Sequence, residues 1–197
     1  MKVGMIFECG KEGADKKVCE YLAQKLLPDI EISSITLTNK PKLLRECGEQ
    51  TAMLLKEGSE QVLIIWDLYP PWREHNEKPC RKEDRERIFS SLKEAGVTSP
   101  NVYLICIREE LEAWLIADGR ALSTVLSTPA HPVKMKDTKK PDNVKNPKGK
   151  LRKIFKETIG RDYNDMVHAE KIVRQLPDLK KRSPSFVSKV CRKADGG

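Results

Sequence analysis

The chain has 197 residues, of which 39% are hydrophobic and 34% are charged, and its net charge is +8. This size suits one compact domain with, at most, a helical appendage. The longest apolar run, residues 62–66, is far shorter than the roughly 20 residues of a membrane-spanning helix. The N-terminus shows no secretion signal, so the expected location is the cytoplasm. Six cysteines without a C-x-x-C pair argue against a zinc ribbon or a thioredoxin-like site.

Apolar runs alternate with helix-type spacing along the first two thirds of the chain. The expected strands cover residues 2–7, 29–37, 61–67 and 101–107, and the expected helices cover residues 14–27, 41–55, 82–94 and 108–118. The third strand is continuously apolar between its end residues, which is typical of a strand buried on both faces of a parallel sheet. This alternation predicts an α/β domain over residues 1–126, with a four-stranded, mostly parallel sheet between helices.

Residues 127–197 are expected to form a basic loop and a helical extension packed on that domain. The loop, residues 126–147, is rich in proline, lysine and aspartate. The helices expected after it cover residues 148–158, 163–175 and 184–193. Ten lysines and arginines but only two acidic residues lie between positions 131 and 156, so this segment carries the whole net charge. Such a segment suggests a polyanionic partner, and a solvated loop and helix face is the alternative.

Acidic residues follow three of the expected strands. Glu8 follows the first, Asp67 ends the third, and Glu110 and Glu112 come after the fourth. Ligands of open parallel sheets bind at the carboxyl ends of the strands, where the strand order reverses. If the first and third strands are neighbours, Glu8 and Asp67 could share one Mg²⁺, with Glu12 as a further ligand. The structural alternative is that each acid caps a helix or sits in its first turn.

Two sets of motifs resemble known families. Residues 7–12, Phe-Glu-Cys-Gly-Lys-Glu, look like the V-E-G-x-x-E opening of Toprim-type domains, and residues 64–69 stand where those domains carry D-x-D. Residues 108–118 resemble the E-x-E-A-W-L-L-A-D signature of the family known as DUF4276, and residues 146–151 and 183–186 are also similar to that family. The resemblance spans nearly the whole chain.

The resemblance implies a Toprim-like fold related to OLD-type nucleases, which handle phosphodiester bonds with Mg²⁺ or Mn²⁺. By position, Glu8 and Glu12 match the first acidic motif and Asp67 the first acid of D-x-D, but Tyr69 replaces the second acid. Either an acid after the fourth strand completes the site, or one ion binds, or catalysis is weak. The expected catalytic and metal-binding residues are Glu8, Glu12, Asp67 and Glu112, with Asp118 as a further metal ligand.

The favoured function is a Mg²⁺-dependent nuclease, or a related phosphodiester-processing hydrolase, acting on nucleic acid. A separate ATPase is a candidate protein partner, and defence against foreign DNA would suit the resemblance to OLD nucleases. The residues expected to grip the nucleic-acid backbone are Lys148, Lys150, Arg152 and Lys153. The alternative is a non-catalytic module of the same fold that binds nucleic acid or a protein partner.

Overall fold

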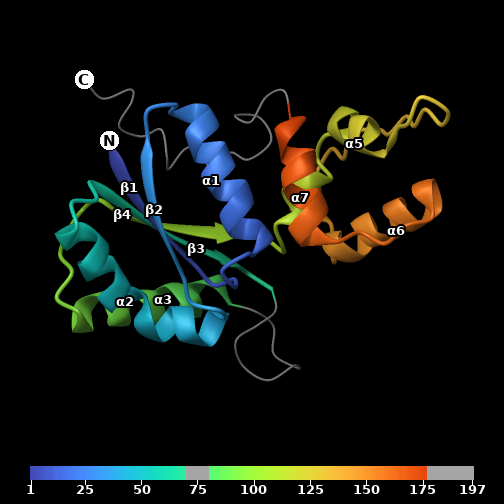
Figure 1. Cartoon of the computed structure of the whole chain (residues 1–197). Helices are drawn as coiled ribbons and strands as arrows, with labels where there is room; N and C mark the ends of the chain where they lie inside the picture. Colours follow the sequence, from blue (N-terminus) through green and yellow to red (C-terminus); the bar gives the residue numbers. More distant parts are fainter. Residues whose placement is uncertain (70–79, 177–197) are drawn as a thin grey trace. The chain divides into compact units, whose positions relative to one another are not determined.

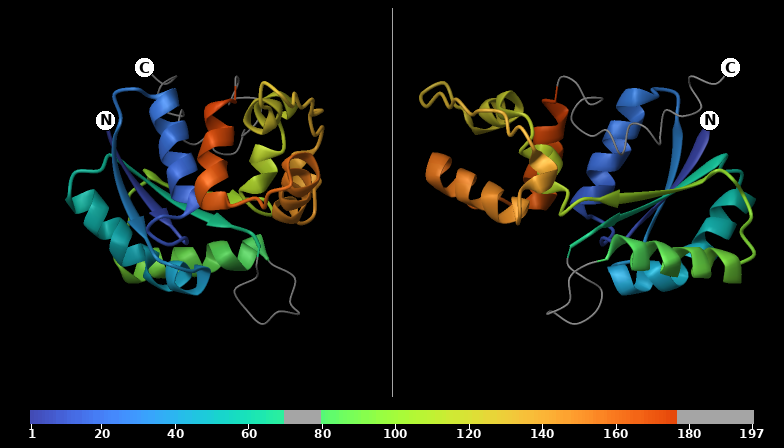
Figure 2. Two further views of the ribbon diagram at one scale, coloured as in Figure 1. Left: turned by 45° about the vertical axis from the view of Figure 1, so that its right-hand side comes forward. Right: turned by 180° about the vertical axis from the view of Figure 1, so that it is seen from behind.

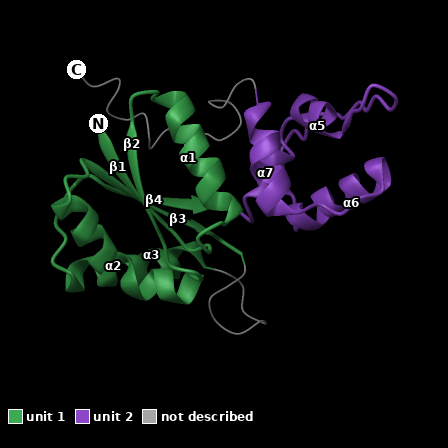
Figure 3. Cartoon of the chain, in the orientation of Figure 1, with its two compact units in different colours: residues 1–107 green, residues 108–197 purple. Residues whose placement is uncertain are grey.

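A computed structural model describes residues 1–69 and 80–176. The chain divides into two compact units, residues 1–107 and 108–197 (Figure 3). The boundary expected from the sequence lies after residue 126, whereas this division lies directly after the last strand. The helix expected over residues 184–193 lies outside the described residues. Over the described ranges, the helices are all too short or too polar to cross a membrane.

The first unit is a four-stranded sheet with helices on both faces (Figure 1). Its strands are β1 (Lys2–Phe7), β2 (Glu31–Thr36), β3 (Gln61–Asp67) and β4 (Val102–Ile107). All neighbouring strands are parallel, in the order β2-β1-β3-β4. The predicted α/β class and parallel sheet are therefore confirmed, and the arrangement is consistent with a Rossmann-like or Toprim-like fold.

Three helices cover the two faces of this sheet. Helix α1 (Ala14–Leu26) lies on one face, and α2 (Lys40–Lys56) and α3 (Arg81–Glu94) lie on the other (Figure 2). The core between the sheet and the α2–α3 layer includes Ile64 and Trp66, both almost completely buried. Burying a large apolar side chain contributes about 1.5–3 kcal/mol. The unbroken apolar sequence of β3 is thus explained, because helices cover both of its faces.

A glycine allows α2 and α3 to approach closely. A Cβ atom at Gly48 would lie 2.0 Å from the backbone oxygen of Ser91. The Ser91 hydroxyl accepts a hydrogen bond from the Gly48 amide and donates one to the Arg45 carbonyl, both at 2.9 Å. The two helices are therefore joined by hydrogen bonds as well as by apolar packing.

The regular elements of the second unit, over its described residues, are all helices. Its elements are α4 (Glu112–Leu115), α5 (Gly119–Leu126), the short 3₁₀ helix η1 (Pro141–Asn143), α6 (Pro147–Ile159) and α7 (Asp165–Arg174). The single helix predicted over residues 108–118 is wrong. Glu109 has a left-handed φ of 63°, and Asp118 is extended and caps a new helix. The apolar spacing of this stretch continues through both breaks, which is why it imitates one helix.

Candidate metal site at the carboxyl edge of the sheet

The strand order places Glu8 and Asp67 at one point of the fold. From β1 the chain goes to β2 on one side, and it later returns on the other side as β3. Phe7 pairs with Ile65, so Glu8, the next residue, lies beside the end of β3. In open α/β sheets this reversal of strand order opens the crevice in which ligands bind. The condition set by the sequence for a shared site, that the first and third strands are neighbours, is therefore met.

Glu8 and Asp67 are in direct contact. The backbone amide of Asp67 donates a hydrogen bond of 3.0 Å to Oε1 of Glu8. The second oxygen of Glu8, Oε2, is buried and has no hydrogen-bond partner in the described structure. A buried carboxylate oxygen without a partner is costly unless a proton or a cation compensates it.

The protonation of Glu8 reflects this burial. Burial raises the pKa of the Glu8 carboxyl from 4.5 to about 7, although the charge of Lys40 and the Asp67 amide both lower it. The negative charges of Asp15 and Asp84 add to the rise. Glu8 therefore changes charge near neutral pH, which is the range in which a carboxylate can exchange a proton for a metal ion or act as a base.

A buried ion pair lies beside these two acids. The ammonium of Lys40 lies 3.8 Å from Oδ2 of Asp84, and the two side chains are only 5% and 2% exposed. The same Asp84 oxygen accepts a hydrogen bond of 3.0 Å from the indole of Trp66. Lys40 also donates a hydrogen bond of 2.8 Å to the carbonyl of Leu68. These contacts join α2 and α3 to the end of β3.

Sequence reasoning missed Lys40, Asp84 and Asp15. Asp84 had a usable signal, because it lies four residues before Ile88 and eight before Leu92, on the buried face of α3. Lys40 had no such signal, since it is a single lysine at a helix start. Asp15 belongs with these residues because its negative charge raises the pKa of Glu8.

Glu12 takes a different position from the one predicted. Its side chain is 67% exposed, and its carboxylate lies 3.0 Å from the ammonium of Lys17. The hydrogen bond and charge of Lys17 lower the pKa of Glu12. Glu12 is therefore a surface carboxylate with its own cation, in contrast to the half-buried Glu8.

The two acids of the edge fit a small divalent cation. Mg²⁺ prefers oxygen ligands and in proteins usually takes one or two carboxylates together with several waters. The buried Oε2 atom of Glu8 would provide one oxygen, and a second carboxylate would come from Asp67, whose backbone amide binds Glu8. Over residues 1–69 and 80–176, no group of three or more His, Cys, Asp or Glu side chains is arranged to hold a metal. The fit is thus to a site of two carboxylates completed by water.

In the second unit, Glu112 is bound to Lys148. The Lys148 ammonium lies 3.8 Å from Oε1 of Glu112, a carboxylate that is only 5% exposed, and it also pairs with Asp165. The Lys148 amide donates to Glu110 at 3.2 Å. Burial lowers the pKa of Lys148, but its hydrogen bond to Asp165 and the nearby acids raise it above its usual value. Two predicted site residues, Glu112 and Lys148, are therefore partners of each other.

Asp118 caps a helix. Its side chain is completely buried, and Oδ1 accepts hydrogen bonds from the amides of Arg120 and Ala121 at 2.9 and 3.0 Å. A cap of this kind is typically worth about 1 kcal/mol. Asp118 is therefore a helix cap, which is the structural role that the sequence left open as the alternative to metal binding.

The other basic residues expected to bind nucleic acid lie on α6. Lys150, Arg152 and Lys153 are all exposed. The ammonium of Lys150 lies 3.5 Å from the hydroxyl of Thr138, and that of Lys153 lies 3.7 Å from Glu157. These exposed side chains, unlike that of Lys148, have few constraints on their position.

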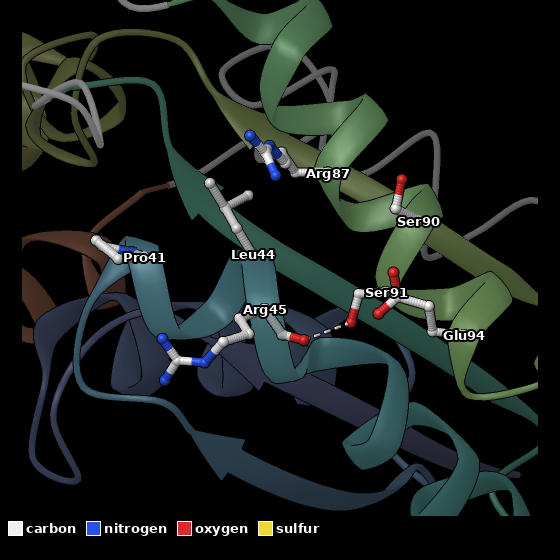
Figure 4. Close-up of a pocket in the computed structure, with 7 residues that line it drawn as sticks. All are labelled: Pro41, Leu44, Arg45, Arg87, Ser90, Ser91 and Glu94. Atoms are coloured by element: carbon white, nitrogen blue, oxygen red, sulfur yellow. Dashed lines mark hydrogen bonds between the residues drawn. The ribbon is translucent and has the colours of Figure 1, made fainter.

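A separate groove opens between α2 and α3 (Figure 4). Its volume is about 300 Å³, and its lining includes Leu44, Arg45, Arg87 and Glu94. The carbonyl of Arg45 and the hydroxyl of Ser91 are hydrogen-bonded across it. All described lining residues belong to these two helices, so the groove is distinct from the Glu8–Asp67 pair.

The amino-acid sequence matches the family described as "Domain of unknown function (DUF4276)" over residues 12–189. The chain belongs to this family. Asp67, Glu112, Asp118 and Lys148 lie inside the matched range of this DUF4276 chain, and Glu8 lies just before it. No curated protein and no solved structure matches the chain. The relationship to Toprim domains and OLD nucleases stays a prediction.

Proposed function

We propose that this DUF4276 chain is a Mg²⁺-dependent phosphodiester-processing enzyme that acts on nucleic acid. One observation carries the proposal. A half-buried carboxylate, Glu8, whose buried Oε2 atom has no hydrogen-bond partner among the described residues, lies beside Asp67 where the strand order of a parallel sheet reverses. Carboxylates that are buried and shifted in pKa at such a position are characteristic of functional sites.

Glu8 and Asp67 would hold the cation, with Mn²⁺ as an alternative to Mg²⁺. A divalent cation in such a site neutralises the negative charge that develops on a phosphate group during displacement. The chain's own part is to keep both carboxylates in place and to present Glu8 in its charged form. Because the pKa of Glu8 is about 7, it is ionised in an increasing fraction of molecules as the pH rises above neutrality.

The decisive experiment is thermal unfolding of the wild type and of Asp67→Asn, with and without millimolar Mn²⁺ or Mg²⁺. A ligand at about ten times its dissociation constant adds roughly 1.4 kcal/mol of stability. In a protein of this size, that corresponds to a rise in melting temperature of about 3–5 °C. We expect this rise in the wild type and its loss in Asp67→Asn.

Asp29→Asn is the matched control, because Asp29 is an exposed aspartate that precedes β2 and so lies at the opposite edge of the sheet. It should keep the full rise in melting temperature. The metal-site proposal is wrong if the wild type shows no rise with either ion, or if Asp67→Asn rises as much as the control.

A second candidate function is nucleic-acid binding without cleavage, and the exposed basic face of α6 favours it. Charge reversal of Lys150 and Arg152 together should weaken binding of a nucleic-acid duplex or single strand at least tenfold at low salt, because phosphate contacts dominate such affinity. The double variant Lys56→Glu/Lys93→Glu makes the same charge change at exposed positions of the first unit. Equal losses in the two double variants would mean that only the net charge matters, and would rule out a binding face on α6.

A further inference from the structure

Lys40 is an unusual residue for the place it occupies. It is the first residue of α2, where a positive charge opposes the helix dipole, and its side chain is 5% exposed. Burying an ammonium group is costly unless it is paired and hydrogen-bonded. A lysine on the surface would avoid the cost of burial, so the contacts that the buried Lys40 side chain makes indicate its role.

Those contacts converge on the last residues of β3. The Lys40 ammonium donates to the carbonyl of Leu68 at 2.8 Å and lies 3.8 Å from Asp84. Asp84 in turn accepts from the indole of Trp66 at 3.0 Å. Lys40 therefore reaches the residue after Asp67 directly, and the residue before it through Asp84.

Asp67 itself is fixed on both sides by different elements. Its amide donates to Glu8, the residue after β1. The Leu68 amide, in the peptide group that follows Asp67, donates to the carbonyl of Ile107 at 2.9 Å, and Lys40 binds the carbonyl of Leu68, one peptide group further on. With its flanking groups fixed to β1, α2 and β4, the Asp67 side chain has a defined starting point relative to Glu8.

We propose that Lys40 is a positioning residue that fixes Asp67 relative to Glu8 through the Leu68 carbonyl. This inference rests on the proposed function, because it assigns Lys40 to the same metal site. Lys40 does not touch the cation in this scheme. It determines where one of the two carboxylates lies, and so how tightly the pair binds a divalent ion.

The sign of the effect separates positioning from simple electrostatics. At an alkaline pH, where both carboxylates are ionised with or without Lys40, a nearby positive charge repels a divalent cation, so removing it by charge alone would tighten binding. Loss of positioning has the opposite effect, because Asp67 then samples orientations in which it does not meet the ion together with Glu8. A weaker affinity after removal of the ammonium is therefore the signature of positioning.

The experiment measures Mn²⁺ affinity by titration calorimetry, well below the melting temperature, in the wild type and in Lys40→Met/Asp84→Asn. The double change avoids leaving Asp84 as a buried charge without its cation, and asparagine still offers an oxygen to the Trp66 indole. We expect the dissociation constant for Mn²⁺ to rise at least tenfold. Lys42→Met changes a half-exposed lysine two residues away that pairs with Glu46, and it should leave the dissociation constant unchanged.

A second readout on the same proteins needs no metal. Hydrogen exchange of the Asp67 amide, followed by NMR, should be at least tenfold faster in the double variant, while that of Leu63 in the same strand stays the same. Unchanged or tighter Mn²⁺ binding in the double variant overturns the positioning role and leaves the metal site standing. If the wild type itself binds no Mn²⁺, the proposed function fails, and an unchanged Asp67 exchange rate would then overturn the role of Lys40 as well.

Discussion

Replacing Asp84 with alanine is expected to lower the free energy of unfolding by about 3–5 kcal/mol, the usual result of removing one partner from a buried ion pair. The variant leaves the ammonium of Lys40 buried without its carboxylate, and the indole of Trp66 loses its hydrogen-bond acceptor. Urea unfolding measures this loss as a lower midpoint with an unchanged slope.

Glu86→Ala is the comparison for Asp84→Ala, because Glu86 is an exposed acid of the same helix that lies 3.9 Å from Lys82. Surface ion pairs are worth about 0–1 kcal/mol, so this variant should be close to the wild type. Asp84→Asn should fall between the two, since it keeps an acceptor for Trp66 but removes the charge facing Lys40. Equal midpoints for Asp84→Ala and Glu86→Ala would show that the buried pair contributes nothing.

Glu8→Gln is expected to change the pH dependence of stability. The pKa of Glu8 is about 7 in the folded protein, against 4.5 without burial. Between these two values the folded state binds more protons than the unfolded state, so the Glu8 contribution falls as the pH rises through this window. A glutamine cannot ionise and does not suffer this loss. The free energy of unfolding of Glu8→Gln minus that of the wild type should therefore be higher at pH 8 than at pH 4, by on the order of 3 kcal/mol.

This comparison between two pH values cancels any constant effect of the glutamine amide. The charged groups that act on the pKa of Glu8 are Lys40, Asp15 and Asp84, each from a different helix. The measurement is chemical unfolding at both pH values in the presence of a chelator. Glu8→Gln should also lose the stabilisation by Mn²⁺, so that the variant is more stable at pH 8 without metal and unresponsive to it.

Glu12→Gln provides the control of opposite sign. Lys17 lowers the pKa of Glu12, so its small contribution is present at neutral pH and is lost as the pH falls. Relative to the wild type, Glu12→Gln should show no gain in the free energy of unfolding between pH 4 and pH 8. A Glu8→Gln profile parallel to that of the wild type over this range would mean that Glu8 titrates normally and is not desolvated.

Much of the first unit was predictable because its signals are local. An unbroken apolar run between Gln61 and Asp67 identified a strand buried on both faces, and alternation of strands with helices identified a parallel sheet. Acids directly after apolar strands pointed to Glu8 and Asp67. Parallel strands end at the same edge of a sheet, so the acids that follow neighbouring strands lie at that edge.

The helical part was predicted less well, since its breaks depend on conformation rather than on spacing. The apolar positions between Leu111 and Leu115 continue the helix pattern on both sides, but Glu109 turns the chain and Asp118 caps a new helix. By composition, Lys148 belonged with Lys150 and Arg152 as a phosphate contact. Its ammonium instead pairs with Asp165 and Glu112, whose distance along the chain hides the pairing from any pattern.

The sequence by itself determined the strands, the parallel sheet and the family, because hydrophobic periodicity and strand ends are readable one segment at a time. The strand order that brings Glu8 beside Asp67 came from the tertiary structure. Only the tertiary structure decided which charges are buried. Lys40 meets the carbonyl of Leu68 and the carboxylate of Asp84 across three elements. A buried ion pair leaves no periodic trace, since each partner looks like an ordinary surface charge until the fold brings the other to it.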